Sequence, residues 1–494
     1  MTTDTAPKPM KGRALALWLL TLVYAFNFID RQIIGIVSPF IKEDLGFTDA
    51  QLGWLKGFAF AVVYCTFAIP IAILADRFNR VKIVTISLAV WSGFTALTGI
   101  ANTFFTMLLA RMGVGIGEAG GSPPSHSIIS DLYNKEERAT ALGVYSLGIP
   151  FGIMFAYFAA GSLIASVGWR GTLIVLGVVG IILAAVVLLV VKEPERGAMD
   201  TDTASEDSEK SRTYVSLREG MQNSSMMPRY VIFGILLALT FIPAIQGVFH
   251  WSIAIGSLLI FALAFWLSVQ PGIKVLLTIP SWWLMCFGIA FVSFGGYAIS
   301  NWGIDYLARW DPTLMEPERF RNLNMWFGLM NGVAYGLGTY GGAKLADILG
   351  KNSVRAYGWL PGVVLIVGVP ALLYAFWVES LVLHLVLITV YLVAAGFYLG
   401  PSFAIAQTLA PIRMRAMSTA LFFFILNMIA LGGGPTVVGI MSSALEPVHG
   451  EVHSLRLAIT WLWLPYLIGI ICFILAAVTL PKDWADAEAR NAAG

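Results

Sequence analysis

Charged residues are scarce in this chain. Only 12% of its 494 residues are Asp, Glu, Lys or Arg, whereas 58% are hydrophobic, and the mean hydropathy is +0.78. Soluble proteins carry about 25% charged and about 45–50% apolar residues. Apolar runs of around 20 residues recur along the whole chain, which is the length that one helix needs to cross a bilayer. The composition excludes a soluble protein and predicts an all-α, polytopic membrane protein.

Several kinds of functional group are also rare or missing. The three cysteines, Cys65, Cys286 and Cys472, each lie inside an apolar run, so we expect neither a disulfide framework nor a metal site. The net charge is only +2 and the loops carry no basic stripe, which argues against nucleic acid as a partner. The chain has no phosphate-binding G-x-x-x-x-G-K-[ST] sequence and no nucleophile–base pattern. We therefore expect no enzyme activity, no cofactor and no ATP-driven transport.

The long apolar segments form two groups of six. The first group lies near residues 14–40, 49–75, 83–101, 104–131, 139–166 and 171–191, and the second near 276–309, 322–348, 357–378, 381–409, 416–443 and 456–480. This pattern predicts an N-terminal six-helix bundle over 1–191, a C-terminal six-helix bundle over 276–481, and a tail over 482–494.

The segment between the two groups has a different composition. Residues 192–227 are polar and read as a cytoplasmic linker. Two shorter apolar runs follow at 230–247 and 249–270, and they predict an inserted helical hairpin within 228–275. If the hairpin crosses the membrane, the chain has fourteen crossings. The alternative is a hairpin that lies along the membrane surface.

The distribution of basic residues predicts the orientation. With the N-terminus inside, the inner segments hold 22 Lys and Arg and the outer segments hold six. Cytoplasmic loops carry such an excess. Three further basic residues, Arg31, Lys56 and Arg111, fall within predicted spans. The polar N-terminus has no cleavage site, so we expect an integral protein of the cell (inner) membrane with both termini in the cytoplasm.

The two halves share a short motif after their second helix. Residues 72–80 read AILADRFNR, and residues 343–351 read AKLADILGK. Both resemble the G-x-L-x-D-R-x-G-R-K signature of the major facilitator superfamily, with Ala in place of the first Gly. Residues 111–119 (RMGVGIGEA) are similar to its R-x-x-x-G-x-G pattern. The resemblance implies two pseudo-repeated bundles with substrate bound between them near the midplane.

A narrower resemblance covers roughly residues 20–197. The stretches NFIDR (27–31), GIPFG (148–152) and EPERG (193–197), together with Glu118 within 111–119, resemble the Spinster family. Members of that family are linked to export of sphingosine-1-phosphate and lysophospholipids. The resemblance implies proton coupling through acidic residues in the first and fourth helices.

Buried charges supply the candidate coupling site. Asp30 and Arg31 lie in the middle of the first span, where an uncompensated charge costs at least ~2.5–3.5 kcal/mol, so they should face protein or water. Arg111 and Glu118 are two helical turns apart and share one face. Burial and a neighbouring arginine act in opposite directions on the proton affinity of a carboxylate, which suits a group that loads and releases a proton. We assign proton coupling to Asp30, Glu118 and Arg111. The alternative for these charges is a fixed ion pair that joins helices.

Two further sets of residues are candidates for other roles. Polar side chains within the spans predict a substrate site made of Arg31, Asn27, Tyr297, Asn301, Tyr335, Tyr398, Gln407 and Asn427. Charged residues in the inner loops predict a conformational lock made of Asp76, Arg77, Arg80, Asp347, Lys351 and Arg138, with Arg413 and Arg415 as further contacts. His126 reads as a packing residue or a proton relay. Asp305 and Arg309, spaced i, i+4, read as an outer gate or as a solvated pair.

Three functions remain open on the sequence alone. The first is a proton-coupled, Spinster-like carrier for an amphipathic lysolipid, working by alternating access. The second keeps this fold and carries a small organic anion such as a sugar acid, because arginine pairs with carboxylate as readily as with phosphate. The third is a transport-inactive membrane sensor. We expect the protons, the small substrate and the lipid bilayer to be its partners, and the chain to be a monomer.

Overall fold

A computed structural model describes residues 10, 12–196, 199, 274–411 and 415–492 of the chain. Every regular element within these residues is a helix. The N-terminal half contains α1 (Arg13–Leu45), α2 (Asp49–Lys56), α3 (Phe58–Arg77), α4 (Arg80–Ile100), α5 (Phe104–Glu118), α6 (Ser122–Leu132), α7 (Lys135–Ser146) and α8 (Gly148–Val190). Residues 228–273 of the predicted 228–275 hairpin and most of the 192–227 linker lie outside the described residues.

The C-terminal half is also helical throughout its described part. It contains α13 (Lys274–Leu277), α14 (Pro280–Trp310), η2 (Pro312–Met315), α15 (Pro317–Leu329), η3 (Met330–Tyr335), α16 (Gly336–Gly350), α17 (Ala356–Ala375), α18 (Leu381–Gly396), α19 (Leu399–Thr408), α20 (Arg415–Leu426), η5 (Asn427–Gly433), α21 (Gly434–His449), α22 (Glu451–Thr460) and α23 (Trp463–Ala492). Because α23 continues to Ala492, most of the predicted tail at 482–494 is helical.

In the described part of the chain, eight continuous helical stretches are long and apolar enough to cross a membrane. One of them, 140–190, makes two passes, because Gly168 has a positive φ of 69° and turns the chain back. The other passes are interrupted helices: α2 with α3, α5 with α6, and α15 with α16 through the π-helical η3. Each half therefore crosses six times within the described residues.

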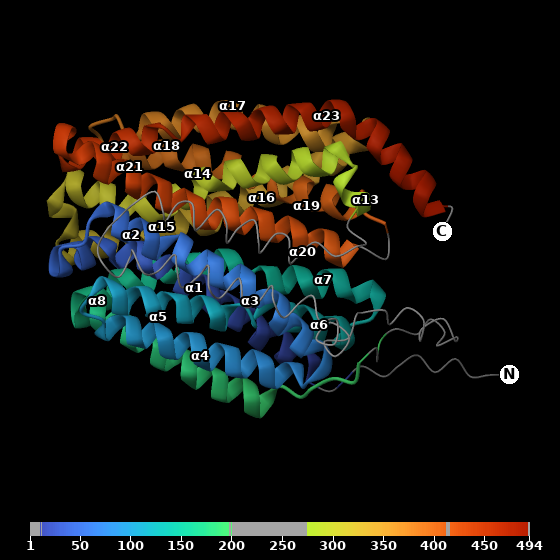
Figure 1. Ribbon diagram of the computed structural model, residues 1–494, viewed down its shortest axis with the longest axis horizontal. Coiled ribbons are helices and arrows are strands. Elements are labelled where there is room, and N and C mark those ends of the chain that lie inside the picture. Colours follow the sequence, from blue (N-terminus) through green and yellow to red (C-terminus); the bar gives the residue numbers. More distant parts are fainter. Residues whose placement is uncertain (1–9, 11, 197–198, 200–273, 412–414, 493–494) are drawn as a thin grey trace, which may run out of the picture.

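The two halves pack side by side along their length. Figure 1 shows α1–α8 in blue to green on one side and α14–α23 in yellow to red on the other. We call the end that holds the loop between α1 and α2 the Asp49 end, and the end that holds the loop between α3 and α4 the Arg80 end. At the Asp49 end, α2 lies against α21, and α15 lies against α8.

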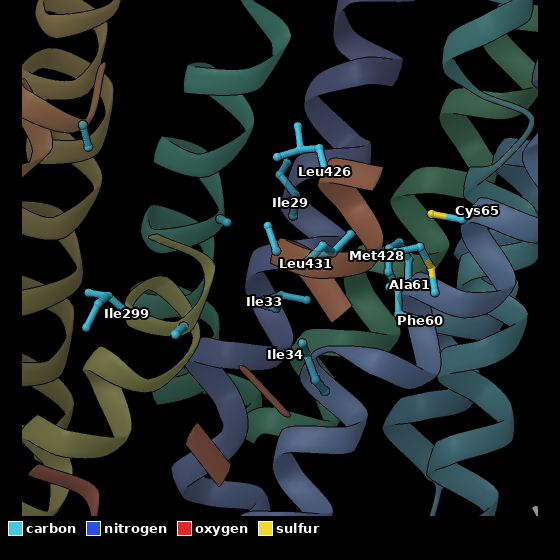
Figure 2. Packing of buried hydrophobic residues seen from close by; sticks show 14 of the residues in the cluster. Ile29, Ile33, Ile34, Phe60, Ala61, Cys65, Ile299, Leu426, Met428 and Leu431 are labelled. Atoms are coloured by element: carbon cyan, nitrogen blue, oxygen red, sulfur yellow. The ribbon is translucent and has the colours of Figure 1, made fainter. Parts of the chain in front are cut away.

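Apolar side chains from both bundles meet near the middle of the molecule. Figure 2 shows Met428 of η5 beside Phe60, Ala61 and Cys65 of α3. The isoleucines of α1 at 29, 33 and 34 belong to the same buried cluster. This apolar layer surrounds the part of α1 in which Asp30 and Arg31 lie.

Candidate functional site

A buried ion pair joins α1 to the end of α5. Arg31 Nε donates to Glu118 Oε2 at 2.8 Å, and the side chains of Arg31 and Glu118 are 9% and 0% exposed. The second carboxylate oxygen, Glu118 Oε1, is buried and accepts no hydrogen bond from any residue that the structure describes. Removing one partner of a buried pair leaves an uncompensated charge at a cost of about 3–5 kcal/mol. The two residues are therefore strongly coupled to each other.

Asp30 and Arg111 lie next to this pair but are held differently. Thr95 of α4 donates its hydroxyl to Asp30 Oδ1 at 2.9 Å, and within the described residues no basic group pairs with the Asp30 carboxylate. Arg111 lies 3.5 Å from two backbone carbonyls, those of Leu55 and Asp30. Asp30 therefore forms no ion pair among the described residues, while the fixed-ion-pair alternative describes the contact that Arg31 makes with Glu118.

Aromatic rings enclose the Arg31 guanidinium. Its Cζ lies 5.2 Å from the Phe28 ring centroid, 5.3 Å from that of Phe60 and 4.6 Å from that of Tyr64. The same Phe60 ring lies 5.3 Å from Arg111. Rings of this kind stabilise a cation by about 0.5–2 kcal/mol each. Arg31 can therefore keep its charge when it leaves Glu118, provided another anion takes the place of the carboxylate.

The C-terminal bundle faces this cluster with tyrosines. Tyr297 of α14 lies close enough to Arg31 to interact with it electrostatically. Tyr398 contacts Tyr335, and the hydroxyl of Ser293 donates to Tyr398 Oη at 3.1 Å. These three tyrosines were predicted from the sequence as substrate residues, and the structure brings them together on the side of the C-terminal bundle that faces Arg31.

The other predicted substrate residues have different surroundings. Asn27 is buried one turn before Arg31, and its Oδ1 accepts no hydrogen bond. Asn301 donates its side-chain amide to the Tyr297 carbonyl at 2.9 Å and packs against the backbone of Gly35, so it joins α14 to α1. Asn427 is buried at the start of η5 and donates to the Phe423 carbonyl at 2.9 Å. Gln407 is exposed on α19, away from this cluster of contacts.

Arg80 forms a clamp inside the N-terminal bundle. It pairs with Asp131 and with Glu193, in the latter case through Nε at 2.7 Å, and it donates to the Pro194 carbonyl at 3.0 Å. Arg196 donates to the carbonyls of residues 75 and 78 at 2.7 and 2.8 Å. Residues 193–196 (EPER) therefore fold back on the loop that precedes α4. The resemblance to the Spinster family included this stretch but gave it no role.

The remaining lock candidates also make contacts within their own half. Tyr357 donates to Asp347 at 2.8 Å, and Arg138 donates to the Ser130 carbonyl at 2.7 Å. Arg77, Lys351 and Arg415 are exposed. The side chain of Asp76 and the whole of Arg413 lie outside the described residues. The proposed switching role of these residues stays a prediction.

Two further contacts at the Arg80 end involve ionisable groups. Arg13 donates to both carboxylate oxygens of Glu137, at 2.6 and 3.0 Å, and these hydrogen bonds hold the pKa of Glu137 below its usual value. The ring of His126 packs edge-on against Tyr145 with centroids 5.0 Å apart. That contact agrees with a packing role for His126.

A set of buried charges joins the two bundles at the Asp49 end. Lys56 Nζ lies 2.7 Å from Asp305 Oδ2, both side chains are at most 1% exposed, and Ser38 donates to the same oxygen at 2.6 Å. Arg309 makes two bonds to Asp49, at 2.6 and 2.7 Å. Asp305 and Arg309 each pair across to the other bundle, so the solvated-pair alternative is wrong. Their role as an outer gate stays a prediction.

Glycines allow the close approach that these contacts need. A side chain at Gly439 of α21 would lie 2.8 Å from the Trp302 ring and 3.0 Å from the Gly53 Cα of α2. Small residues of this kind let helix backbones approach closely in membranes. In addition, the Thr436 hydroxyl accepts from the Phe58 amide at 3.1 Å, where α2 gives way to α3.

We expect Gly439→Val to hold the Asp49 end open, because valine cannot fit between α21 and α2. The measurement is disulfide formation between cysteines introduced at Ala50 and Ser443, which are in hydrogen-bond contact, in a background without the three native cysteines. Cross-linking should be efficient in the parent and largely lost in Gly439→Val. Gly93→Val is the matched control, because a side chain there would meet nothing within 4 Å. Equal cross-linking in all three proteins would contradict the packing account.

The sequence reasoning missed several residues of this network. Lys42, Asp49 and Glu451 were not singled out as candidates; Lys42 bonds to Asp49 at 3.0 Å and also pairs with Glu451. Lys56 gave a signal, since a lysine inside a span needs a partner. Nothing in the sequence identified Asp305 as that partner, because the two residues are far apart in the chain and in different halves.

Comparisons with known proteins agree with this architecture. The family model of the Major Facilitator Superfamily matches residues 20–316. An MFS-type efflux pump of Mycolicibacterium smegmatis is 27% identical over 99% of this chain and 98% of its own length. Protein spinster homolog 1 of Xenopus tropicalis is 25% identical over 95% of this chain and 81% of its own. A probable L-galactonate transporter of Escherichia coli is 30% identical, over 34% of this chain and 37% of its own.

A solved structure extends the likeness to the whole fold. It is the crystal structure of a bacterial homologue of the human lysosomal transporter Spinster, in an inward-facing and unoccupied conformation. The TM-score is 0.76 at 25% identity, covering 96% of this chain and 99% of that one. The expected fold and the resemblance to Spinster are confirmed. The matched family model, the two six-pass bundles and the buried charges between them show that this chain belongs to the Major Facilitator Superfamily of membrane transporters.

Proposed function

We propose that this transporter is a proton-coupled secondary carrier that moves an amphipathic lysolipid- or sphingolipid-type anion by alternating access. The observation that carries the proposal is the buried Arg31–Glu118 pair, which lies at the junction of the two bundles beside Tyr297. The pair offers one cation for an anionic substrate and one carboxylate for a proton.

The substrate anion and Glu118 compete for Arg31, and this competition couples binding of the anion to binding of the proton. While Glu118 is ionised, it occupies the Arg31 guanidinium at 2.8 Å. A substrate phosphate that takes Arg31 leaves Glu118 buried without a counter-ion, and the carboxylate then gains a proton because a lone buried charge is costly. Binding of the anion and of the proton therefore favour each other. Since the carrier crosses with both or with neither, the two ligands move in the same direction.

Contacts between the bundles support one of the two states that this cycle needs. The ion pairs and glycine contacts between the bundles close the Asp49 end. The positive-inside rule assigns this end to the outside of the cell and both termini to the cytoplasm. The state is then closed to the outside, in agreement with the likeness to an inward-facing structure. The opposite state opens the Asp49 end and exposes the central site there.

The surroundings of Arg31 favour an amphipathic substrate. Phe28, Phe60 and Tyr64 enclose its guanidinium, and the apolar cluster of α1, α3 and η5 lies next to it. A phosphate headgroup would meet Arg31, and an acyl or sphingoid tail would meet the apolar walls. The similarity to Spinster proteins supports the same substrate class.

A small organic anion is the second candidate substrate. It is supported by the partial similarity to a probable L-galactonate transporter and by the preference of arginine for carboxylate as well as phosphate. The coupling chemistry at Arg31 and Glu118 would be the same, and only the size and polarity of the cargo would differ.

The test uses proteoliposomes that contain a trapped pH-sensitive dye. Lysophosphatidic acid, sphingosine-1-phosphate, zwitterionic lysophosphatidylcholine or D-glucuronate is added outside, with protein-free liposomes as the control. We expect the two anionic lipids to acidify the lumen and the other compounds to leave it unchanged. Acidification by D-glucuronate alone would replace the lipid with a small organic anion. Alkalinisation by the lipids would overturn cotransport in one direction, and no proton movement with any anion would overturn proton coupling.

A further inference from the structure

One face of α14 covers the N-terminal bundle between the central site and the Asp49 end. Tyr297, Asn301, Asp305 and Arg309 are spaced four residues apart, so they share one face of the helix. Tyr297 meets Arg31, Asn301 packs on Gly35, Asp305 binds Lys56 and Arg309 binds Asp49. The residues of the N-terminal bundle that this face contacts therefore follow one another from the central site to the Asp49 end.

Three basic residues lie along that series. Arg31 and Arg111 share contact with the ring of Phe60. Arg111 in turn lies 3.5 Å from the carbonyl of Leu55, the residue before Lys56. The cations therefore continue from Arg31 through Arg111 to Lys56, and α14 contacts the first and the last of them.

Lys56 depends on α14 for its contacts. Its ammonium lies 2.7 Å from Asp305 and 3.6 Å from the centroid of the Trp302 ring, and both residues belong to α14. The nearest acidic residue of its own bundle in the network, Asp49, is bonded instead to Lys42 and Arg309. When the bundles separate at the Asp49 end, Lys56 loses Asp305 and Trp302, while Asp49 keeps Lys42.

We propose that Lys56 is a second anion-binding station of the transporter, which takes the substrate's phosphate or carboxylate when the Asp49 end opens. This inference rests on the alternating access of the proposed function. A cation held at this depth needs a counter-charge, and the substrate anion supplies it when Asp305 moves away. The substrate anion thus replaces Asp305 as the partner of Lys56, just as it replaces Glu118 as the partner of Arg31.

A simpler role for the same contacts is a gate in which Lys56 only holds the bundles together. The two roles differ once Asp305 is neutral. If Lys56 only forms a gate, its replacement in the Asp305→Asn protein causes no further change in anion binding, because the pair is already broken. In an anion station, the lysine of the opened protein still binds substrate.

The experiment measures equilibrium binding of radiolabelled lysophosphatidic acid and, separately, D-glucuronate to purified protein at pH 6. Asp305→Asn should bind an anion more tightly than wild type, because Lys56 is no longer covered. Lys56→Met/Asp305→Asn should bind that anion at least about tenfold more weakly than Asp305→Asn, because one charge-assisted contact is lost. The probe that shows this difference identifies the anion class. Lys56→Arg/Asp305→Asn should retain the binding.

Lys42→Met/Asp305→Asn is the matched control, since it removes a neighbouring cation that, besides its contact with Glu451 across the bundles, has an acidic partner, Asp49, in its own bundle. It should bind like Asp305→Asn. Equal affinity of Asp305→Asn and Lys56→Met/Asp305→Asn for both probes would overturn the anion station and leave a gate. Equal losses in the Lys42 and Lys56 double variants would overturn it too, since the effect would then be one of overall charge.

Failure of the proposed coupling would be seen separately. The effect of Lys56 should persist in a Glu118→Gln background, because Glu118 belongs to the central site and makes no contact with Lys56. If the dye experiment shows no proton movement while the Lys56 difference remains, the anion station stands and proton coupling does not.

Discussion

Glu118→Gln is expected to abolish transport driven by a pH gradient, down to the level of protein-free liposomes. Glutamine has nearly the shape of glutamate and can still accept a hydrogen bond from Arg31, but it cannot take up a proton. Arg31 is then permanently available to the substrate anion. We therefore expect Glu118→Gln to keep substrate binding and exchange of labelled for unlabelled substrate across the membrane.

Glu137→Gln is the matched control for this substitution. Glu137 also pairs with an arginine, Arg13, but the pair lies at the Arg80 end and is partly exposed. The same chemical change there should leave pH-driven transport close to wild type. Undiminished pH-driven transport by Glu118→Gln would remove Glu118 from the coupling mechanism, whatever the substrate is.

Arg31→Gln is expected to have the second large effect. It leaves Glu118 buried with Arg111 as the remaining basic neighbour, and Arg111 makes no ion pair with it. The loss of a buried partner costs about 3–5 kcal/mol unless the carboxylate takes up a proton. We expect lower thermal stability at neutral pH, recovery of stability as the pH falls, and loss of anion binding at every pH. Thermal unfolding and binding of lysophosphatidic acid measure the two effects.

The double variant Arg31→Gln/Glu118→Gln separates stability from function. With both charges removed, two amide side chains replace the ion pair, so stability should return towards the wild-type value and lose its pH dependence. Anion binding should stay lost, because no cation replaces Arg31. Recovery of binding together with stability would show that Arg31 only holds the helices in place, and would contradict its assignment to the substrate.

Much of the fold could be predicted from the sequence, because helix length and charge distribution are local properties. The apolar segments gave the six passes of each half, and the basic loops gave their predicted orientation. The interruptions at Gly57 and at the π-helical η3 and η5 could not be read in this way, because they depend on packing between helices. The ends of helices were also less certain, as the extension of α23 to Ala492 shows.

The sequence identified residues of the candidate site, but it did not predict the contacts that they make. A charge inside a span indicates a buried polar contact, and this drew attention to Asp30, Arg31, Arg111 and Glu118. Their partners depend on how α1, α3, α4 and α5 pack, so the binding of Asp30 to Thr95 was not foreseen. The pairing of Lys56 with Asp305 likewise joins two halves that the sequence treats separately.

We propose that binding of the anion and binding of the proton are linked through Arg31 and Glu118. Proton uptake by purified protein on addition of lysophosphatidic acid, followed with an indicator dye in weak buffer, tests this link without the need for transport. If D-glucuronate proves to be the substrate, the same measurement is made with it. We expect uptake of up to about one proton per bound anion in wild type and none in Glu118→Gln, as linked equilibria require. Anion binding without proton uptake in wild type, or equal uptake in both proteins, would contradict it.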